Sequence, residues 1–83
     1  MWHVYILRCC DDSLYVGVTI DIVERLARHN DGRGSVFTAA RRPVALVYTE
    51  GYAAAKPAFE RERQLKKWRH AKKEALIAAN VAL

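Results

Sequence analysis

An 83-residue chain leaves room for one domain, expected over residues 1–83, and none for a second. It carries 14 Lys and Arg against 9 Asp and Glu, a net charge of +5, and 52% of its residues are hydrophobic. This composition excludes a disordered basic tail, and apolar runs of at most five residues exclude a transmembrane helix. We recognise no signal peptide, expect a soluble cytoplasmic protein, and take the excess charge to indicate a polyanionic partner.

The excess positive charge is confined to the C-terminal third of the chain. Residues 1–55 hold six Arg and six acidic residues, whereas residues 56–83 hold eight basic and three acidic residues. No segment rich in Gly, Ser or Pro separates the two parts. The uneven charge therefore belongs to the surface of one domain and not to a detachable tail.

The first 18 residues predict a β-hairpin. Residues 2–8 alternate between two faces, with side chains at even positions on one and side chains at odd positions on the other. Residues 9–13 have the small and polar composition of a turn. Residues 14–18 are rich in strand-forming side chains and are expected to pair back onto the first strand.

A helix is expected next, over residues 22–29. Asp21 fits the N-cap, and Glu24 three residues later would complete an acidic capping box. The side chains expected to point inward are those of Val23, Leu26 and Ala27. An Asn-Asp-Gly sequence over residues 30–32 is typical of a helix end.

The rest of the chain predicts a strand and a long helical region. A loop over residues 32–40 leads to a strand over residues 44–49, and a helical pattern runs from Pro57 to the end, with a break near residues 69–70. This order of elements predicts an α+β fold, in which a small three-stranded antiparallel sheet is flanked by helices.

One carboxylate of the helical region lies on its apolar side. That side is formed by Ala58, Phe59, Leu65, Trp68 and Leu76. Glu62 is three residues from an apolar neighbour in each direction, whereas Glu60 points away. A carboxylate that faces a core or cleft costs free energy unless something compensates its charge. Glu62 is therefore either a salt-bridge residue, paired with Arg25 or Arg69, or a metal ligand or catalytic group.

Two other pairs of polar side chains allow a functional interpretation. Arg25 and His29 are one helical turn apart beside the apolar stripe, where they either face a cleft or form a solvated edge. Tyr5 and Tyr15 belong to the two paired strands, where tyrosines commonly serve packing. Gly17 shares the face of Tyr15 and permits the close approach of a ligand or of another backbone.

In their order along the chain, these residues resemble the GIY-YIG nuclease domain, and specifically its small stand-alone bacterial UPF0213 form. The two signature segments are matched by residues 3–5, where His3 replaces the glycine, and by residues 15–17. The R-x-x-x-H pattern of the first helix is matched by Arg25 and His29. Residues 61–68, RERQLKKW, resemble the pattern R-E-x-Q-[IL]-K-x-[WL].

Two further segments complete the resemblance. Phe37-Thr38 and then Arg41-Arg42-Pro43-Val44 match the stretch that leads into the third strand. Asn80 falls where an Asn usually precedes a short Pro-x-Trp tail, which is replaced here by residues 81–83, Val-Ala-Leu. The ordered set spans residues 3–80, and this order is far more specific than any three-residue motif.

The resemblance implies that the protein hydrolyses phosphodiester bonds, with Mg²⁺ or Mn²⁺ bound to Glu62. Tyr5 would act as the general base, and Tyr15 would assist by hydrogen bonding to the nucleophile or the phosphate. Arg25 would hold the scissile phosphate, a role that suits a guanidinium. His29 would position the phosphate or relay a proton to the leaving group. Further substrate contacts are expected from Gly17, Thr38, Arg41, Arg42, Lys66, Lys67 and Asn80.

The leading hypothesis is a metal-dependent endonuclease acting on branched, nicked or otherwise irregular DNA, linked to DNA repair or recombination. A protein partner or the shape of the substrate would supply selectivity, and no membrane is involved. One alternative is a nucleic-acid-binding module of the same fold that cuts slowly or not at all. Another is a structural or protein-interaction domain in which Glu62 forms an ordinary ion pair. Exposed aromatic residues are too few in the sequence to argue for a base-stacking platform.

Overall fold

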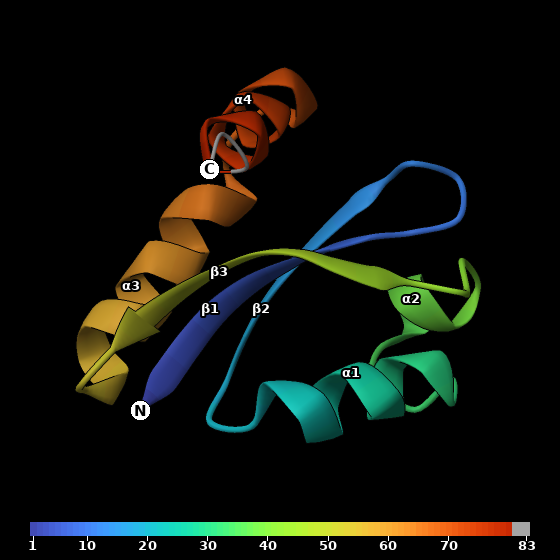
Figure 1. Ribbon diagram of the computed structural model, residues 1–83, viewed down its shortest axis with the longest axis horizontal. Coiled ribbons are helices and arrows are strands. Elements are labelled where there is room, and N and C mark those ends of the chain that lie inside the picture. The colour runs from blue at the N-terminus through green and yellow to red at the C-terminus, as the bar shows by residue number, and fades with distance from the viewer. Residues whose placement is uncertain (81–83) are drawn as a thin grey trace.

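The computed structural model describes residues 1–80, which form three strands and four helices (Figure 1). In chain order the elements are β1 (Trp2–Arg8), β2 (Leu14–Thr19), α1 (Ile22–Asn30), α2 (Val36–Ala39), β3 (Ala45–Tyr52), α3 (Ala55–Lys66) and α4 (His70–Asn80). The sheet has the order β2-β1-β3, and both strand pairs are antiparallel. The predicted α+β fold with a three-stranded antiparallel sheet is therefore confirmed.

The predicted hairpin forms with a tight turn between β1 and β2. The backbone N–H of Cys9 donates to the carbonyl of Ser13 at 2.9 Å, and Asp12 takes a left-handed conformation with φ of 69°. An aspartate tolerates this conformation better than most residues. The turn fixes the register of the strands, which sets Tyr5 directly opposite Gly17.

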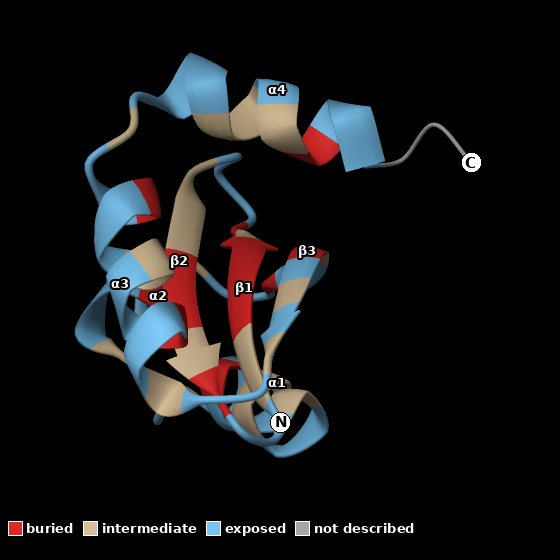
Figure 2. Ribbon diagram, turned by 90° about the vertical axis from the view of Figure 1, so that its left-hand side faces the viewer, coloured by how far each residue is buried: buried red, intermediate tan, exposed pale blue. Residues whose placement is uncertain are grey.

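Helices α3 and α4 cover one face of the sheet. Val4 and Ile6 of β1 are fully buried there against Ala58 and Leu65 of α3 and Ile77 of α4. Figure 2 shows buried residues on the central strand and on parts of α3 and α4. Strand β1 is the middle strand and is covered on both faces, so apolar side chains occupy its even and its odd positions alike.

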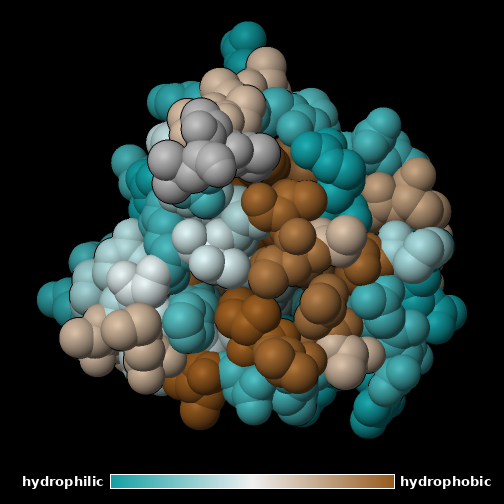
Figure 3. All heavy atoms as spheres, in the orientation of Figure 1, coloured by the Kyte–Doolittle hydropathy of each residue, from teal (hydrophilic) through white to brown (hydrophobic). Residues whose placement is uncertain are grey.

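Helix α1 covers part of the other face, where Tyr5 and Leu7 pack against Ile22 and Leu26. This cover stops short of the edge strand β3, and Leu46 of β3 stays 37% exposed. Figure 3 shows hydrophobic atoms gathered across the centre of this side of the molecule. The side chain of Tyr5 is thus fixed between the sheet and α1.

The cap of α1 differs in one detail from the expectation. Asp21 is the N-cap, and its side chain accepts the N–H of Glu24 at 3.0 Å, as predicted. The reciprocal half of the capping box does not form, because the Glu24 carboxylate pairs with Arg28 at 2.6 Å. The N–H of Asp21 donates to the Thr19 hydroxyl instead.

The inward face of α1 was only partly predicted. Leu26 packs inward as expected, but Val23 is 81% exposed and Ala27 also faces solvent. The inward positions next to Leu26 belong to Arg25 and to the buried His29. Apolar residues were assigned to this face by hydrophobicity, whereas the fold gives part of it to polar side chains.

The predicted loop over residues 32–40 contains a short helix, α2, so that prediction was wrong. Ser35 caps α2, since its hydroxyl accepts the N–H of Thr38 at 3.0 Å. Four residues are too few for a periodic pattern to reveal a helix. The cap holds Thr38 in place, and Thr38 is fully buried.

The later elements follow the prediction with shifted ends. Strand β3 runs to Tyr52, and α3 begins before Pro57, which is tolerated in the first turn of a helix. The break expected near residues 69–70 separates α3 from α4. Phe59 is 42% exposed and packs on Trp2 instead of entering the core.

Helix α4 is tied to the sheet by a bidentate ion pair. Both terminal nitrogens of Arg8 donate to the Glu74 carboxylate at 2.7 Å, and Ile77 is buried. Residues 81–83, which stand where the resemblance has a C-terminal tail motif, lie outside the described residues. Within residues 1–80, no helix combines the length and the apolar character needed to cross a membrane.

Strand β3 and helix α3 are joined through one carboxylate. Glu50 accepts hydrogen bonds from Arg61 and from the hydroxyls of Tyr48 and Tyr52. Burial disfavours the charge of Glu50, but the hydrogen bonds outweigh this effect and lower its pKa. Glu50 therefore stabilises the fold as an anion.

We predict that Glu50→Gln lowers the free energy of unfolding by about 2 kcal/mol at pH 7, measured in urea. Because its pKa is lowered in the fold, Glu50 adds to the free energy of unfolding above the ordinary carboxyl pKa. This stabilisation is lost as the pH falls below that value. The difference between wild type and variant should therefore shrink in acid. Glu24→Gln is the control, because its pair with Arg28 is exposed and should contribute under about 0.5 kcal/mol. Equal losses in both variants would contradict this account.

Candidate active site

Four polar side chains form a buried network between β1, α1 and α2. The Tyr5 hydroxyl lies 2.9 Å from Nε2 of His29, and Nδ1 of His29 lies 2.8 Å from the Thr38 hydroxyl. The Thr38 hydroxyl in turn lies 2.8 Å from that of Ser35. Tyr5 and His29 are 2% and 1% exposed. We call Tyr5, His29, Thr38 and Ser35 the buried network.

One tautomer of His29 suits these contacts best. With the ring proton on Nδ1, His29 donates to Thr38, and Nε2 accepts the hydroxyl proton of Tyr5. Thr38 can then donate to the carbonyl oxygen of Ser35 at 3.4 Å. Among residues 1–80, this tautomer gives the Tyr5 proton an acceptor, which a buried hydroxyl requires.

Burial and neighbouring charges shift the pKa values of both aromatic groups. Burial, with a smaller effect of Tyr15, raises the pKa of Tyr5 to about 12, although the guanidinium of Arg25 opposes the rise. Burial also lowers the pKa of His29, assisted by the positive charges of Arg25 and Arg28. At pH 7 the network therefore holds a neutral phenol and a neutral imidazole.

Two glycines make room for the network. A methyl group on Gly17 would lie 2.3 Å from the Tyr5 hydroxyl oxygen, and one on Gly34 would lie 2.1 Å from Nδ1 of His29. Such contacts do not occur between real atoms, so a side chain at either position would displace a ring. The close approach expected at Gly17 is thus to the Tyr5 ring itself.

Tyr15 connects the network to the surface. Its ring meets the His29 ring edge-on at 5.0 Å and is stacked beside Phe37 at 6.1 Å. The guanidinium of Arg41 lies over the Phe37 ring, 3.9 Å from its centre, and pairs with Asp11 at 3.3 Å. Tyr15 is half-buried and reaches a groove that the fully enclosed His29 does not.

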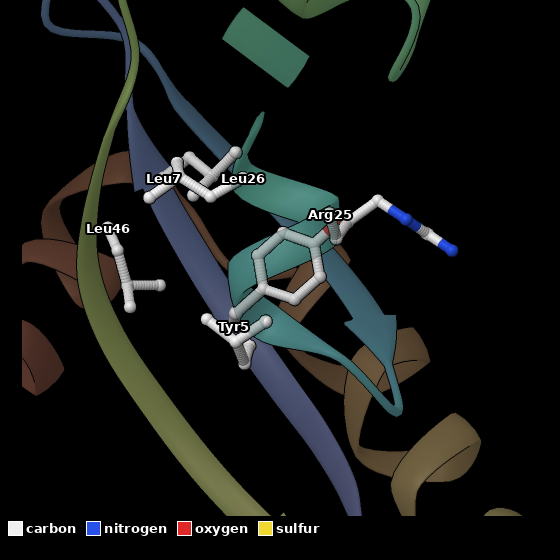
Figure 4. Close-up of a pocket in the computed structure, with 6 residues that line it drawn as sticks. Tyr5, Leu7, Arg25, Leu26 and Leu46 are labelled. Carbon is white, nitrogen blue, oxygen red and sulfur yellow. The ribbon is translucent and has the colours of Figure 1, made fainter. Parts of the chain in front are cut away.

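Arg25 lies beside Tyr5, and both line a small, mainly apolar pocket. Figure 4 shows the Tyr5 ring among apolar side chains, including Leu7 and Leu46, with the Arg25 guanidinium pointing away from them. Within residues 1–80, Nε of Arg25 is buried without a hydrogen-bond partner. An unsatisfied buried donor is costly, and a ligand that supplies an acceptor would remove this cost.

Glu62 has the inward orientation that its helix position predicted. Its side chain is 18% exposed, and its negative charge contributes to the raised pKa of Tyr5. The carboxylate pairs with Lys66 at 3.3 Å, one turn along α3, and not with the expected Arg25 or Arg69. No group of three or more His, Cys, Asp or Glu that could hold a metal ion occurs within residues 1–80. A single carboxylate still fits Mg²⁺, which keeps several waters and needs few protein ligands.

The remaining predicted residues lie in different places. Thr38 belongs to the buried network, while Arg42 donates to the backbone carbonyls of Ala39 and Asn30. Lys67 is the exposed C-cap of α3. Asn80 ends α4, which lies at the opposite end of the molecule from α1 in Figures 1 and 2. The substrate contacts predicted for these residues stay predictions.

One predicted role does not suit the structure. Both ring nitrogens of His29 are engaged and its side chain is enclosed, so it cannot contact a phosphate without breaking the network. Sequence reasoning also missed Ser35 and Gly34. The Ser-x-x-Thr spacing of a helix cap and the glycine beside it were the available signals.

The GIY-YIG catalytic domain family matches residues 1–75. The chain belongs to this family. A UPF0213 protein of Bacillus pumilus is 44% identical over 75 residues, which cover 90% of this chain and 76% of that protein. A UPF0213 protein of Natronomonas pharaonis is 42% identical over 76 residues, covering 92% and 89%. The solution structure of a UPF0213 protein from Bacillus halodurans matches with a TM-score of 0.64 and 35% identity, covering 99% of this chain and 88% of that one.

We predict that Gly17→Ala and Gly34→Ala each destabilise the GIY-YIG domain by about 1–3 kcal/mol, because the added methyl group meets a buried ring. Urea unfolding measures the effect. Gly51→Ala is the matched control, since its methyl group meets the side chain of the exposed Met1, which can move. Its free energy of unfolding should change by less than about 0.5 kcal/mol. Similar losses at all three glycines would refute the assignment of close packing.

Arg25→Gln should raise the pKa of His29, because a positive charge that disfavours protonation is removed. The same substitution should raise the pKa of Tyr5 further, since the phenolate loses a stabilising charge. An NMR titration of the His29 ring protons measures the first effect directly. Arg33→Gln is the control, because Arg33 is exposed and pairs with Asp31. An unchanged His29 midpoint in Arg25→Gln would contradict the proposed proximity.

Proposed function

We propose that this protein is a metal-dependent endonuclease that hydrolyses DNA phosphodiester bonds. GIY-YIG domains form a nuclease family, so a nucleic acid is the substrate class that family membership implies. The observation that carries the proposal is the position of Tyr5. Its hydroxyl is hydrogen-bonded to a neutral His29 and lies beside Arg25, whose Nε is an unsatisfied donor.

Arg25 would bind the scissile phosphate. A guanidinium presents several donors in one plane and stays charged at all relevant pH values, which suits two phosphate oxygens at once. Turning toward the phosphate would also give its buried Nε an acceptor. The bound phosphate would then lie next to the Tyr5 hydroxyl, where the attacking water is needed.

Tyr5 and His29 would move the proton of the attacking water. A free phenolate is rare for a group with a pKa of about 12, so Tyr5 is a poor base by itself. The hydrogen bond to Nε2 allows Tyr5 to pass its own proton to His29 as it accepts one from water. Thr38 holds the imidazole in the tautomer that leaves Nε2 free to accept.

Glu62 would hold the metal ion. When bound, Mg²⁺ or Mn²⁺ would supply positive charge to the transition state and the leaving oxygen. Binding requires Glu62 to exchange its pair with Lys66, which would release Lys66 toward the substrate. Tyr15, half-buried and in contact with His29, would hydrogen-bond the nucleophile or the phosphate.

The biological role would be the processing of branched or nicked DNA in repair or recombination in the cytoplasm. Residues 56–80 carry eight basic side chains against three acidic ones, and these would attract the DNA backbone. A protein partner would add selectivity to a site of this size. If the protein binds DNA but does not cleave it, it is the alternative, a nucleic-acid-binding module.

The test compares cleavage of labelled flap, nicked and four-way-junction DNA in Mg²⁺ and in Mn²⁺. Tyr5→Phe removes the proton carrier and Glu62→Gln removes the metal ligand. Each should lower the cleavage rate by about 10²-fold or more. Glu60→Gln is the matched control, because Glu60 is on the same helix and exposed, and it should cleave like wild type.

Two results would overturn the proposal. One is cleavage by Glu62→Gln at the wild-type rate, with chelator-resistant activity. The other is binding that weakens with salt but yields no product with either metal, which would establish the binding module instead.

A further inference from the structure

A groove runs along the start of β2, next to the buried network but outside it. Its walls come from β2, α2, α3 and α4, the elements that surround β2 in Figure 2. Its lining residues are Leu14, Tyr15, Val16, Phe37, Lys66 and Lys73. We call it the β2 groove. It is open to solvent and holds about 210 Å³.

One wall of the β2 groove is aromatic. The rings of Tyr15 and Phe37 are within 28° of parallel, and their centres are 6.1 Å apart, so they are offset and both border the groove. Phe37 is 37% exposed. The guanidinium of Arg41 lies over the Phe37 ring and pairs with Asp11, so an ion pair borders this wall.

The other wall is cationic. The side chain of Lys66 is 51% exposed, and Lys73 approaches from α4. Lys66 also pairs with Glu62, so the groove adjoins the proposed metal-binding carboxylate. An aromatic surface facing two amines is complementary to a flat ring joined to an anion.

We propose that the β2 groove binds one unpaired nucleotide of the DNA substrate. The base packs against Phe37 and Tyr15, and the attached phosphate lies between Lys66 and Lys73. This inference rests on the proposed nuclease function and names the feature of DNA that the site selects. The few aromatic residues of the chain suggested no base-stacking surface, but the fold brings two of them together.

The size of the groove and the chemistry of stacking favour an unpaired nucleotide. Its volume is below the roughly 300–1,000 Å³ of pockets that enclose drug-sized ligands, so it suits one ring system. A base inside a duplex has both faces covered by its neighbours. The groove would therefore favour flaps, gaps and junctions over intact duplex.

A binding cycle tests the proposal. Fluorescence anisotropy in EDTA measures the affinity of wild type and Phe37→Leu for two flap DNAs, one with normal bases and one whose flap is abasic throughout. Phe37→Leu should weaken binding to the normal flap by roughly 5- to 150-fold. It should change binding to the abasic flap by less than about twofold, because no base is present to stack. Phe37→Trp, which keeps an aromatic ring, should bind the normal flap like wild type.

Phe59→Leu is the matched control for the aromatic wall. Phe59 is similarly exposed but packs on Trp2, outside the groove, and its substitution should affect neither flap. Lys66→Gln with Lys73→Gln should weaken both flaps and reduce the dependence of affinity on salt. Lys56→Gln, an exposed lysine outside the groove, should do so much less.

The outcomes separate this proposal from the nuclease function. Equal weakening of both flaps by Phe37→Leu, or no weakening of either, would overturn base stacking in the groove. If either of these results were found and the protein still cleaved DNA in Mg²⁺, the proposed nuclease function would be retained. Selective loss on the normal flap without any cleavage would support the groove and overturn the nuclease.

Discussion

The hydrogen bond between Tyr5 and His29 is the interaction on which the rest of the structure depends. It joins the central strand to α1, and the next bond, from His29 to Thr38, joins α1 to α2. Polar groups buried this deeply must be hydrogen-bonded. This requirement constrains the β1–β2 turn, the Ser35 cap of α2 and the position of α1. The two glycines that accommodate the rings follow from the same constraint. Fold and proposed chemistry therefore use the same atoms.

The same burial limits what the tyrosine can do alone. Taking Tyr5 out of water raises its pKa to about 12, which holds its proton more firmly than in solution. A reaction at neutral pH then needs a proton acceptor in contact with it and positive charge beside it. The structure supplies both, in a neutral His29 and in Arg25. The conflict between burial and basicity explains why these three side chains would act as one unit.

Sequence reasoning predicted the sheet well because alternation and turn composition are local signals. It selected Glu62 over Glu60 because a helix of known phase places one carboxylate inward. It failed on the inward face of α1, where hydrophobicity ranks Val23 above His29 although His29 is the buried residue. The partner of Glu62 was also missed, since Lys66 on the same helix is nearer than any distant arginine. Buried polar pairing depends on tertiary contacts that no local pattern encodes.

Charge and chemistry are separated along the sequence but not in space. The first 55 residues are electrically neutral and supply Tyr5, Tyr15, Arg25 and His29, whereas the excess charge follows on α3 and α4. Strand β2 brings the two parts together, because Tyr15 contacts His29 on one side and shares the β2 groove with Lys66 and Lys73 on the other. A polyanion drawn to the basic helices would thus lie at the aromatic wall, and Tyr15 of that wall contacts the buried network. The net charge alone predicts that the protein attracts a polyanion. The position of β2 indicates where on the surface that polyanion would bind.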